Sequence, residues 1–203
     1  MFPFKNRKTV RVKEDKLYYS YSSESSTKED MDEMSFLLTT LCKSYNREII
    51  FLCIGSDRST GESFGPFVGT MLKENHFPHH VFGTIADPVH ALNLNLVLKE
   101  IDNRFSEPII FGVDACLGDS HQIGSILLKE GPLIPGCAIN NLLPELGNYH
   151  LKAVVNHLDC ITPVSSLNTT RLDTVLTLAK ITSTIILNSA KNKSNAKMTA
   201  NHY

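Results

Sequence analysis

The sequence predicts an α/β fold, a three-layer α/β/α sandwich with a central mixed, mostly parallel sheet of about five strands. Three short apolar runs, 49–54, 81–85 and 109–113, alternate with two helix-length segments, 63–75 and 88–104. Runs that are apolar throughout are typical of strands covered on both faces, as in parallel sheets. Their alternation with helices predicts right-handed crossovers between neighbouring parallel strands.

The remaining elements complete this sandwich. Segment 31–45 is predicted as a helix, and a long closing helix is predicted from Leu172 onward because apolar residues recur there at helical spacing. The linker 115–124 is too short for a helical crossover, so the strand expected at 125–128 should be antiparallel. A last apolar stretch, 151–155, supplies the fifth strand.

The chain is expected to be one domain with polar ends. It has 203 residues, of which 42% are hydrophobic, which is enough for a substantial core. The expected boundaries are a polar N-terminal arm at 1–29, a single α/β/α domain at 30–190 and a polar C-terminal tail at 191–203. Within the arm, Leu17–Tyr21 is either loosely ordered or an edge strand.

Composition argues against several classes of partner. The formal net charge is −1, with 20 Lys and Arg against 21 Asp and Glu, so nucleic acid is not an expected partner. No apolar stretch is long enough for a membrane span, and residues 1–16 lack the apolar core of a signal peptide. The five cysteines are widely spaced without a Cys-x-x-Cys pair, which indicates reduced, buried thiols. We therefore expect a cytoplasmic protein.

Acidic residues follow the predicted parallel strands, where open α/β sheets bind ligands. Glu62 lies in the glycine-containing loop after the first strand, near the start of a helix whose dipole should favour the ionised carboxylate. Asp114 follows the apolar strand 109–113. If the two strands are neighbours, the two carboxyls form either an acid/base pair or part of a divalent-metal site. The alternatives are that Glu62 is simply an acid favoured at a helix start and that Asp114 simply caps the following turn.

Three further features affect the chemistry predicted for this site: a candidate third metal ligand, a phosphate-binding loop and a nucleophilic cysteine. His90 follows the middle strand and is the candidate third metal ligand, together with Glu62 and Asp114; otherwise it is a polar surface residue. A phosphate-binding loop is disfavoured because Gly61 is followed by Glu62 instead of a Lys-Ser/Thr pair. Cys116 is disfavoured as a nucleophile because the sequence places no histidine beside it.

Five segments together resemble the YyaC-type sporulation proteins, which are related to the spore germination protease and more distantly to the hydrogenase maturation proteases. The segments are FLCIGSDRSTGESFGP (51–66), VFGTIADPVHA (81–91), VDACL (113–117), GPLIPG (131–136) and NTTR (168–171). The resemblance covers about residues 47–190. It implies a maturation-protease-like α/β/α domain and an endospore-forming bacterium as the source.

The resemblance also implies roles for the two acids. Glu62 falls where the germination protease has an aspartate and where the maturation proteases have a metal-binding glutamate. Asp114 matches the second acid of both groups. Gly61 departs from the maturation pattern, which has a further acid there, and neither relative supplies a ligand at His90. Asp57 and Arg58 belong to the YyaC-type loop, but the resemblance transfers no role to them. The alternative is that they simply pair with one another.

Residues and resemblance together predict a sporulation-associated, protease-like hydrolase in which Glu62 and Asp114 activate a water molecule. A divalent metal ion is an optional cofactor, and the expected partner is a protein or peptide substrate, with small acid-soluble spore proteins as candidates. One alternative is a catalytically inactive regulator or binding module that keeps the fold. Another is a small-molecule hydrolase or phosphorylase, which requires a closed apolar pocket beside the two acids.

Overall fold

The computed structural model describes residues 16–135, 143–159 and 161–198. The strands are β1 (Lys16–Ser22), β2 (Ile49–Cys53), β3 (His80–Phe82), β4 (Ile109–Gly118), β5 (Ser125–Glu130) and β6 (Tyr149–His157). The helices are α1 (Lys28–Lys43), α2 (Phe64–Glu74), α3 (Leu94–Arg104), α4 (Pro163–Asn168) and α5 (Leu172–Met198), with short 3-10 helices η1 (Gly61–Ser63) and η2 (Ser120–Gln122).

The strands form one mixed sheet in the order β1-β5-β6-β4-β2-β3. β3, β2, β4 and β6 pair in parallel, whereas β5 runs antiparallel to both of its neighbours, β6 and β1. The antiparallel direction of β5 is the one predicted from the short linker before it. The parallel strands therefore end at one edge of the sheet, where ligand sites of such folds lie.

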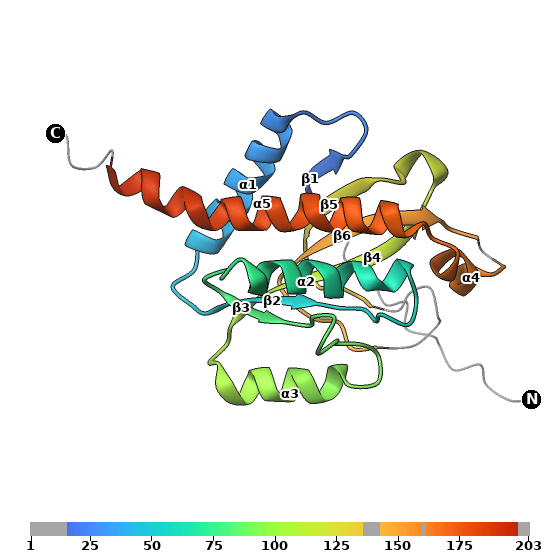
Figure 1. Cartoon of the computed structure of the whole chain (residues 1–203). Helices are drawn as coiled ribbons and strands as arrows, with labels where there is room; N and C mark the ends of the chain where they lie inside the picture. The colour runs from blue at the N-terminus through green and yellow to red at the C-terminus, as the bar shows by residue number, and fades with distance from the viewer. Residues whose placement is uncertain (1–15, 136–142, 160, 199–203) are drawn as a thin grey trace, which may run out of the picture.

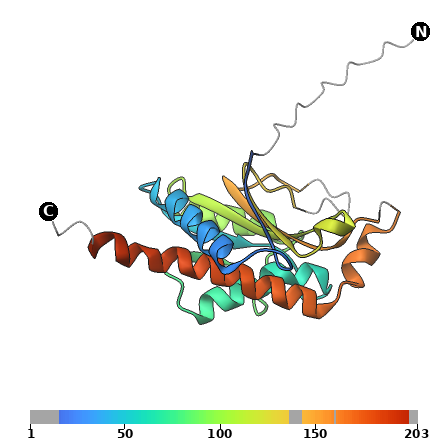
Figure 2. The same ribbon diagram turned by 90° about the horizontal axis from the view of Figure 1, so that it is seen from above.

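Helices cover the sheet on both faces, which confirms the predicted three-layer sandwich (Figure 1). One face packs against α1, α2 and α5 through a core that includes Met34, Phe64 and Val175. Figure 2 shows α1 lying along α5, where Thr39 Oγ1 donates a hydrogen bond of 2.9 Å to the Ser189 carbonyl. β2, between these layers, is buried at every residue, as its apolar sequence requires.

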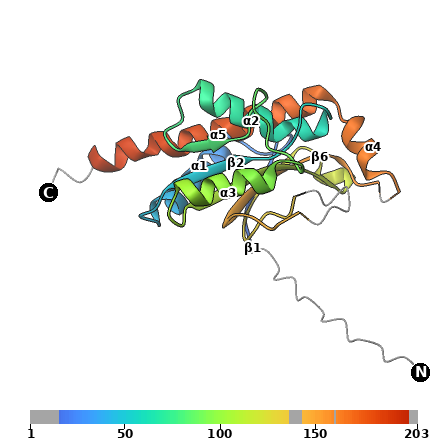
Figure 3. The same cartoon turned by 90° about the horizontal axis from the view of Figure 1, so that it is seen from below.

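The opposite face is covered in two parts. α3, seen in front of the sheet in Figure 3, packs Leu94 and Ile101 against Ile50 and Leu52 of β2. Beyond α3, Leu133 and Leu146 bridge to one another and join the same cluster. Leu133, just after β5, lies against Gly112 and so covers part of β4 on this face.

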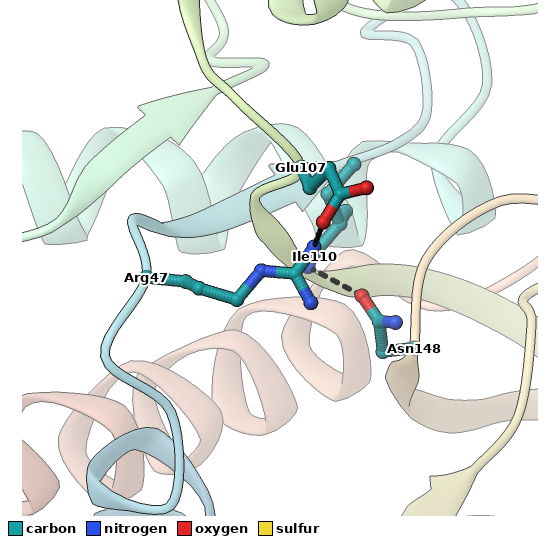
Figure 4. A network of polar contacts seen from close by, with 4 residues as sticks. All are labelled: Arg47, Glu107, Ile110 and Asn148. Atoms are coloured by element: carbon teal, nitrogen blue, oxygen red, sulfur yellow. Dashed lines mark hydrogen bonds and ion pairs between the residues drawn. The ribbon is translucent and has the colours of Figure 1, made fainter.

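A polar cluster fixes the starts of three parallel strands (Figure 4). Asn148, just before β6, accepts a 3.0 Å hydrogen bond from the Ile110 amide through Oδ1 and donates its own amide to the Ile110 carbonyl at 2.9 Å. Arg47, before β2, pairs with Glu107, before β4, at 2.9 Å. These contacts align β2, β4 and β6 at the end of the sheet opposite to their carboxyl ends.

The structure has one more strand than predicted. Lys16–Ser22 pairs with β5 as an edge strand, so the edge-strand alternative describes Leu17–Tyr21, while residues 1–15 lie outside the described chain. α5 continues to Met198, into the segment expected as a tail. In the described residues, no helix combines the length and the apolar character that crossing a membrane requires.

α3 begins later than expected, at Leu94 instead of residue 88. Asn93 explains the difference, because its side chain accepts a 2.8 Å bond from the His90 amide and donates one of 2.9 Å to the Pro88 carbonyl. Such side-chain bonds to the local backbone compete with helix formation. The preceding residues therefore form a loop that reaches the edge of the sheet.

Candidate active site

A pocket of about 450 Å³ lies at the carboxyl ends of β2 and β4, and Glu62, His90 and Asp114 all line it. The three predicted residues, which are far apart in the chain, are thus brought together by the sheet. β2 and β4 are adjacent and in register, with Cys53 opposite Val113. This neighbour relationship is the condition on which the prediction of a paired acid site depended.

Glu62 is held in η1 by backbone contacts of the loop after β2. The Glu62 carbonyl accepts a 3.2 Å hydrogen bond from the Ser56 amide, and Gly55 packs directly on the same carbonyl. Gly55 has φ +145°, and a Cβ atom there would collide with Glu62 and with the Pro66 ring. Only glycine satisfies both constraints without strain. The loop therefore fixes the backbone from which the carboxylate projects.

The pKa of Glu62 is raised because burial disfavours the charged carboxylate, while the nearby His90 acts in the opposite direction. The expectation that the helix dipole favours ionised Glu62 stays a prediction, because burial is the main cause of the raised pKa.

Asp114 lies within β4, because this strand continues to Gly118 instead of ending at residue 113. Its side chain is partly accessible from the pocket. Burial raises the pKa of Asp114 to about 7, and the negative charge of Glu62 adds to this increase. The Lys152 charge and a backbone hydrogen bond from Ala115 act in the opposite direction. Near neutral pH the protonated and ionised forms of Asp114 are therefore both populated, which suits a general acid or base.

Lys152 is a pocket residue that the sequence analysis missed. It lies directly opposite Asp114 in the parallel register of β4 and β6. On β5, Lys129 also lines the pocket. A signal for Lys152 was present in the sequence, because a lysine inside the apolar stretch 151–155 is costly to bury without a partner or a task.

His90 lies in the loop before α3, which is joined to β2 by the bridge between Ile54 and Val89. Its Nδ1 accepts a 3.2 Å hydrogen bond from the Leu92 amide, which assigns the ring proton to Nε2 in the neutral side chain. Within the described residues, no group of three or more His, Cys, Asp or Glu side chains is arranged to hold a metal ion. The role of Glu62, Asp114 and His90 as metal ligands stays a prediction.

Two other expectations concern residues near the site. Cys42 and Cys53 are buried as expected, but Cys116 is partly exposed and lines the pocket beside Asp114. Asp57 and Arg58 are exposed and form no ion pair with one another, so the suggested pairing is wrong. The Arg58 amide instead donates a 3.2 Å hydrogen bond to Ser56 Oγ.

Comparisons with known proteins agree with this architecture. The chain is 36% identical over 167 residues to a Bacillus subtilis (strain 168) protein named "Uncharacterized protein YyaC", an alignment covering 82% of this chain and 80% of that protein. The crystal structure of the [NiFe] hydrogenase maturation protease HycI from Thermococcus kodakarensis KOD1 matches with a TM-score of 0.52 and 16% identity. That match covers 76% of this chain and 99% of HycI, and it shows a shared fold.

The family comparison covers most of the chain, including the whole of the pocket described above. Residues 21–185 match the family described as "Protein of unknown function (DUF1256)". This span begins in β1 and ends within α5, so it contains every strand that contributes to the site. The chain therefore belongs to the DUF1256 family.

Proposed function

We propose that this protein is a peptidase that hydrolyses peptide bonds with Glu62 and Asp114 as its acidic pair. The observation that carries the proposal is that the two carboxyls line one pocket, in which burial raises the pKa of both and brings that of Asp114 to about 7. Two carboxyls in such a pocket can divide the roles of base and acid. The protease-like fold supports a hydrolytic reaction but does not by itself define one.

The electrostatics assign a role to each acid. Because burial, with a smaller contribution from the Glu62 charge, raises the pKa of Asp114 to about 7, we assign Asp114 as the protonated acid and Glu62 as the carboxylate. Glu62 accepts a proton from a water molecule as the water oxygen forms a bond to the carbonyl carbon. Asp114 donates a hydrogen bond to the carbonyl oxygen, on which negative charge develops. The C–N bond then breaks, and the leaving nitrogen takes the proton that Glu62 has accepted.

The cellular setting is proposed as the cytoplasm of a sporulating bacterium, with small acid-soluble spore proteins as candidate substrates. The resemblance of the strand-end loops to the YyaC-type sporulation proteins supports this setting. The 36% sequence identity to a Bacillus subtilis protein supports it as well. The apolar walls of the pocket suit the side chains of a peptide. They include Ile54, Leu127, Leu143, Val154, Leu158 and Leu167.

The direct test is cleavage of purified small acid-soluble spore proteins, and of peptides from a digested bacterial proteome, followed by mass spectrometry of the new termini. Reactions are run with added divalent metal and with chelator. We expect cleavage by the wild type and a loss of at least about a hundredfold in Glu62→Gln and in Asp114→Asn. Asp57→Asn is the matched control, since it changes an exposed acid of the same loop.

Each outcome has a distinct meaning. Normal cleavage by both Glu62→Gln and Asp114→Asn would overturn the roles of these residues. An absence of cleavage by the wild type under every condition would overturn the peptidase proposal. If tight binding of a protein substrate persists in that case, the protein is a binding module on a protease fold.

A small-molecule hydrolase is the second candidate, because the pocket volume of about 450 Å³ and its apolar walls also suit a compact ligand. Screening small esters, amides and glycosides against the wild type and the two acid variants tests this possibility. Turnover of such a compound that depends on Glu62 and Asp114, without any peptide cleavage, would favour it.

A further inference from the structure

The pocket floor carries charges of opposite sign at its two sides. Four side chains lie on or beside successive strands of the sheet, in the order β2, β4, β6 and β5. In that order they are Glu62, Asp114, Lys152 and Lys129, and all four line the pocket. The floor thus changes from acidic at the β2 side to basic at the β5 side.

The two lysines lie on one face of the sheet. Lys152 and Leu127 are direct partners in the β5 and β6 pairing, and Lys129 lies two residues beyond Leu127. Because side chains two apart on a strand share a face, Lys129 and Lys152 both project to the pocket side. Both are half-buried, and neither forms an ion pair with any acidic residue in the described ranges.

Neutralising Asp114 does not account for both lysines. Lys152 acts electrostatically on Asp114, but Lys129 is one strand further away. Burial also raises the pKa of Asp114 to about 7, so this acid carries less than a full negative charge near neutral pH. A half-buried lysine without a counter-charge is unfavourable, so the β5 side of the floor attracts an anion.

We propose that Lys129 and Lys152 bind a single carboxylate of a peptide ligand whose backbone crosses the pocket floor from β4 toward β5. The proposal rests on the proposed function only in taking the ligand to be a peptide. A polyphosphate is a poorer fit, because its several charges would be repelled by Glu62 and Asp114, whereas apolar walls with two cations suit one carboxylate.

The strand spacing predicts where this carboxylate lies relative to the bond attacked. β6 separates β4 from β5, so the strands of Asp114 and Lys129 are roughly 10 Å apart. An extended peptide advances about 3.3 Å per residue, and the carboxylate should therefore lie about three residues from the carbonyl over Asp114. It can be either a chain terminus or an acidic side chain, and the peptides below distinguish the two.

The test is a calorimetric titration of the full-length protein at neutral pH and low salt with three acetylated peptides. The first is Leu-Ala-Leu-Ala with a free terminal carboxylate, the second is its carboxamide, and the third is the carboxamide of Leu-Ala-Glu-Ala. We expect at least one carboxylate peptide to bind about tenfold or more tightly than the neutral carboxamide. The preference should weaken at high salt. Tighter binding of the first peptide would show that the lysines bind the carboxylate of a chain terminus. Tighter binding of the third would show that they bind an acidic side chain.

Substitution of the lysines makes the test specific. Lys129→Met should abolish the preference for a carboxylate and Lys129→Arg should retain it, because only the arginine keeps the charge. Lys180→Met is the matched control, since this exposed lysine lies on α5, at the other face of the sheet. Lys152→Met should also reduce the preference.

The outcomes separate this inference from the peptidase proposal. Equal or undetectable binding of the charged and neutral peptides would overturn the carboxylate site, as would a preference that survives in Lys129→Met. Carboxylate-dependent binding in a protein that cleaves no peptide would support the site and remove the peptidase activity. Peptide cleavage without a preference for a carboxylate would support the peptidase activity and remove the carboxylate site.

Discussion

Asp114 of β4 lies directly opposite Lys152 of β6, on the face of the sheet that lines the pocket. The lysine stabilises the carboxylate form of Asp114, while burial and Glu62 stabilise the acid form, and the balance leaves the pKa of Asp114 at about 7. A change to any one of these three influences should therefore move the protonation of Asp114 in a direction that can be stated beforehand.

The pH dependence of peptide cleavage should report Asp114 as the acid. Because Asp114 must hold a proton, kcat/KM is expected to fall as the pH rises through about 7. Lys152→Met removes a positive charge that lowers the pKa of Asp114, so the alkaline fall should move to higher pH. Profiles measured with one peptide for the wild type and Lys152→Met check this. An alkaline fall at the same pH in both proteins would contradict the assignment.

The stability of the fold should also depend on Asp114. Its pKa is about 7 in the folded protein, whereas the ordinary pKa of an exposed aspartate is 3.8. The folded state therefore holds a proton that the unfolded chain has lost, and the free energy of unfolding falls as pH rises between these values. Above pH 7, Asp114→Asn should be more stable than the wild type by at most about 4 kcal/mol, since each pKa unit corresponds to roughly 1.4 kcal/mol.

Thermal unfolding at mildly acidic and at mildly alkaline pH measures this difference. The gap in Tm between Asp114→Asn and the wild type should widen from acid to alkali, whereas Asp57→Asn, an exposed acid, should track the wild type. A gap that is constant across the pH range would show that the Asp114 charge is not destabilising.

Gly55→Ala should damage both the fold and the site. The added Cβ meets the Glu62 carbonyl in a backbone conformation with φ +145°, so a cost of roughly 1–3 kcal/mol and a displaced Glu62 are expected. Urea unfolding measures the first effect and peptide cleavage the second. Gly124→Ala is the control, because this glycine also has positive φ, +91°, but its Cβ would meet only Ser23. Comparable loss of activity in both variants would contradict a specific role for the Gly55 contact.

The contacts in Figure 4 should contribute unequally to stability. Asn148→Ala removes the oxygen that accepts a hydrogen bond from the Ile110 amide, and a loss of about 1 kcal/mol is expected. Arg47→Ala breaks an exposed ion pair with Glu107 and should cost less than half as much. Urea midpoints of the two variants give the comparison. A larger loss in Arg47→Ala would reverse this ranking of a hydrogen bond to a backbone amide above a surface ion pair.

The sequence alone predicted the layered fold and the two acids because both depend on local patterns. The apolar run 109–113 and the short linker after Asp114 determine a parallel strand followed by an antiparallel one. Lys152 could be suspected from its apolar neighbours, but its position opposite Asp114 depends on pairing between strands far apart in the chain. Periodicity carries no information on such a register.

Burial was the other property that the sequence could not supply. The helix start beside Glu62 predicts a favoured negative charge, whereas the burial that raises the Glu62 pKa depends on the folded pocket, whose walls include residues of β4 and β6. The boundary of α3 likewise depended on the hydrogen bonds of Asn93, a residue that is compatible with a helix or with a turn.

The Asn148 contacts hold the strands at the end of the sheet opposite to Asp114 and Lys152. The residues that align the strands are therefore separate from the residues that line the pocket. A laboratory library could therefore randomise positions 116, 129, 152 and 154 to seek new specificities while Asn148 and Ile110 keep the scaffold in register. The protein thus offers a frame on which the pocket can be redesigned without redesigning the sheet.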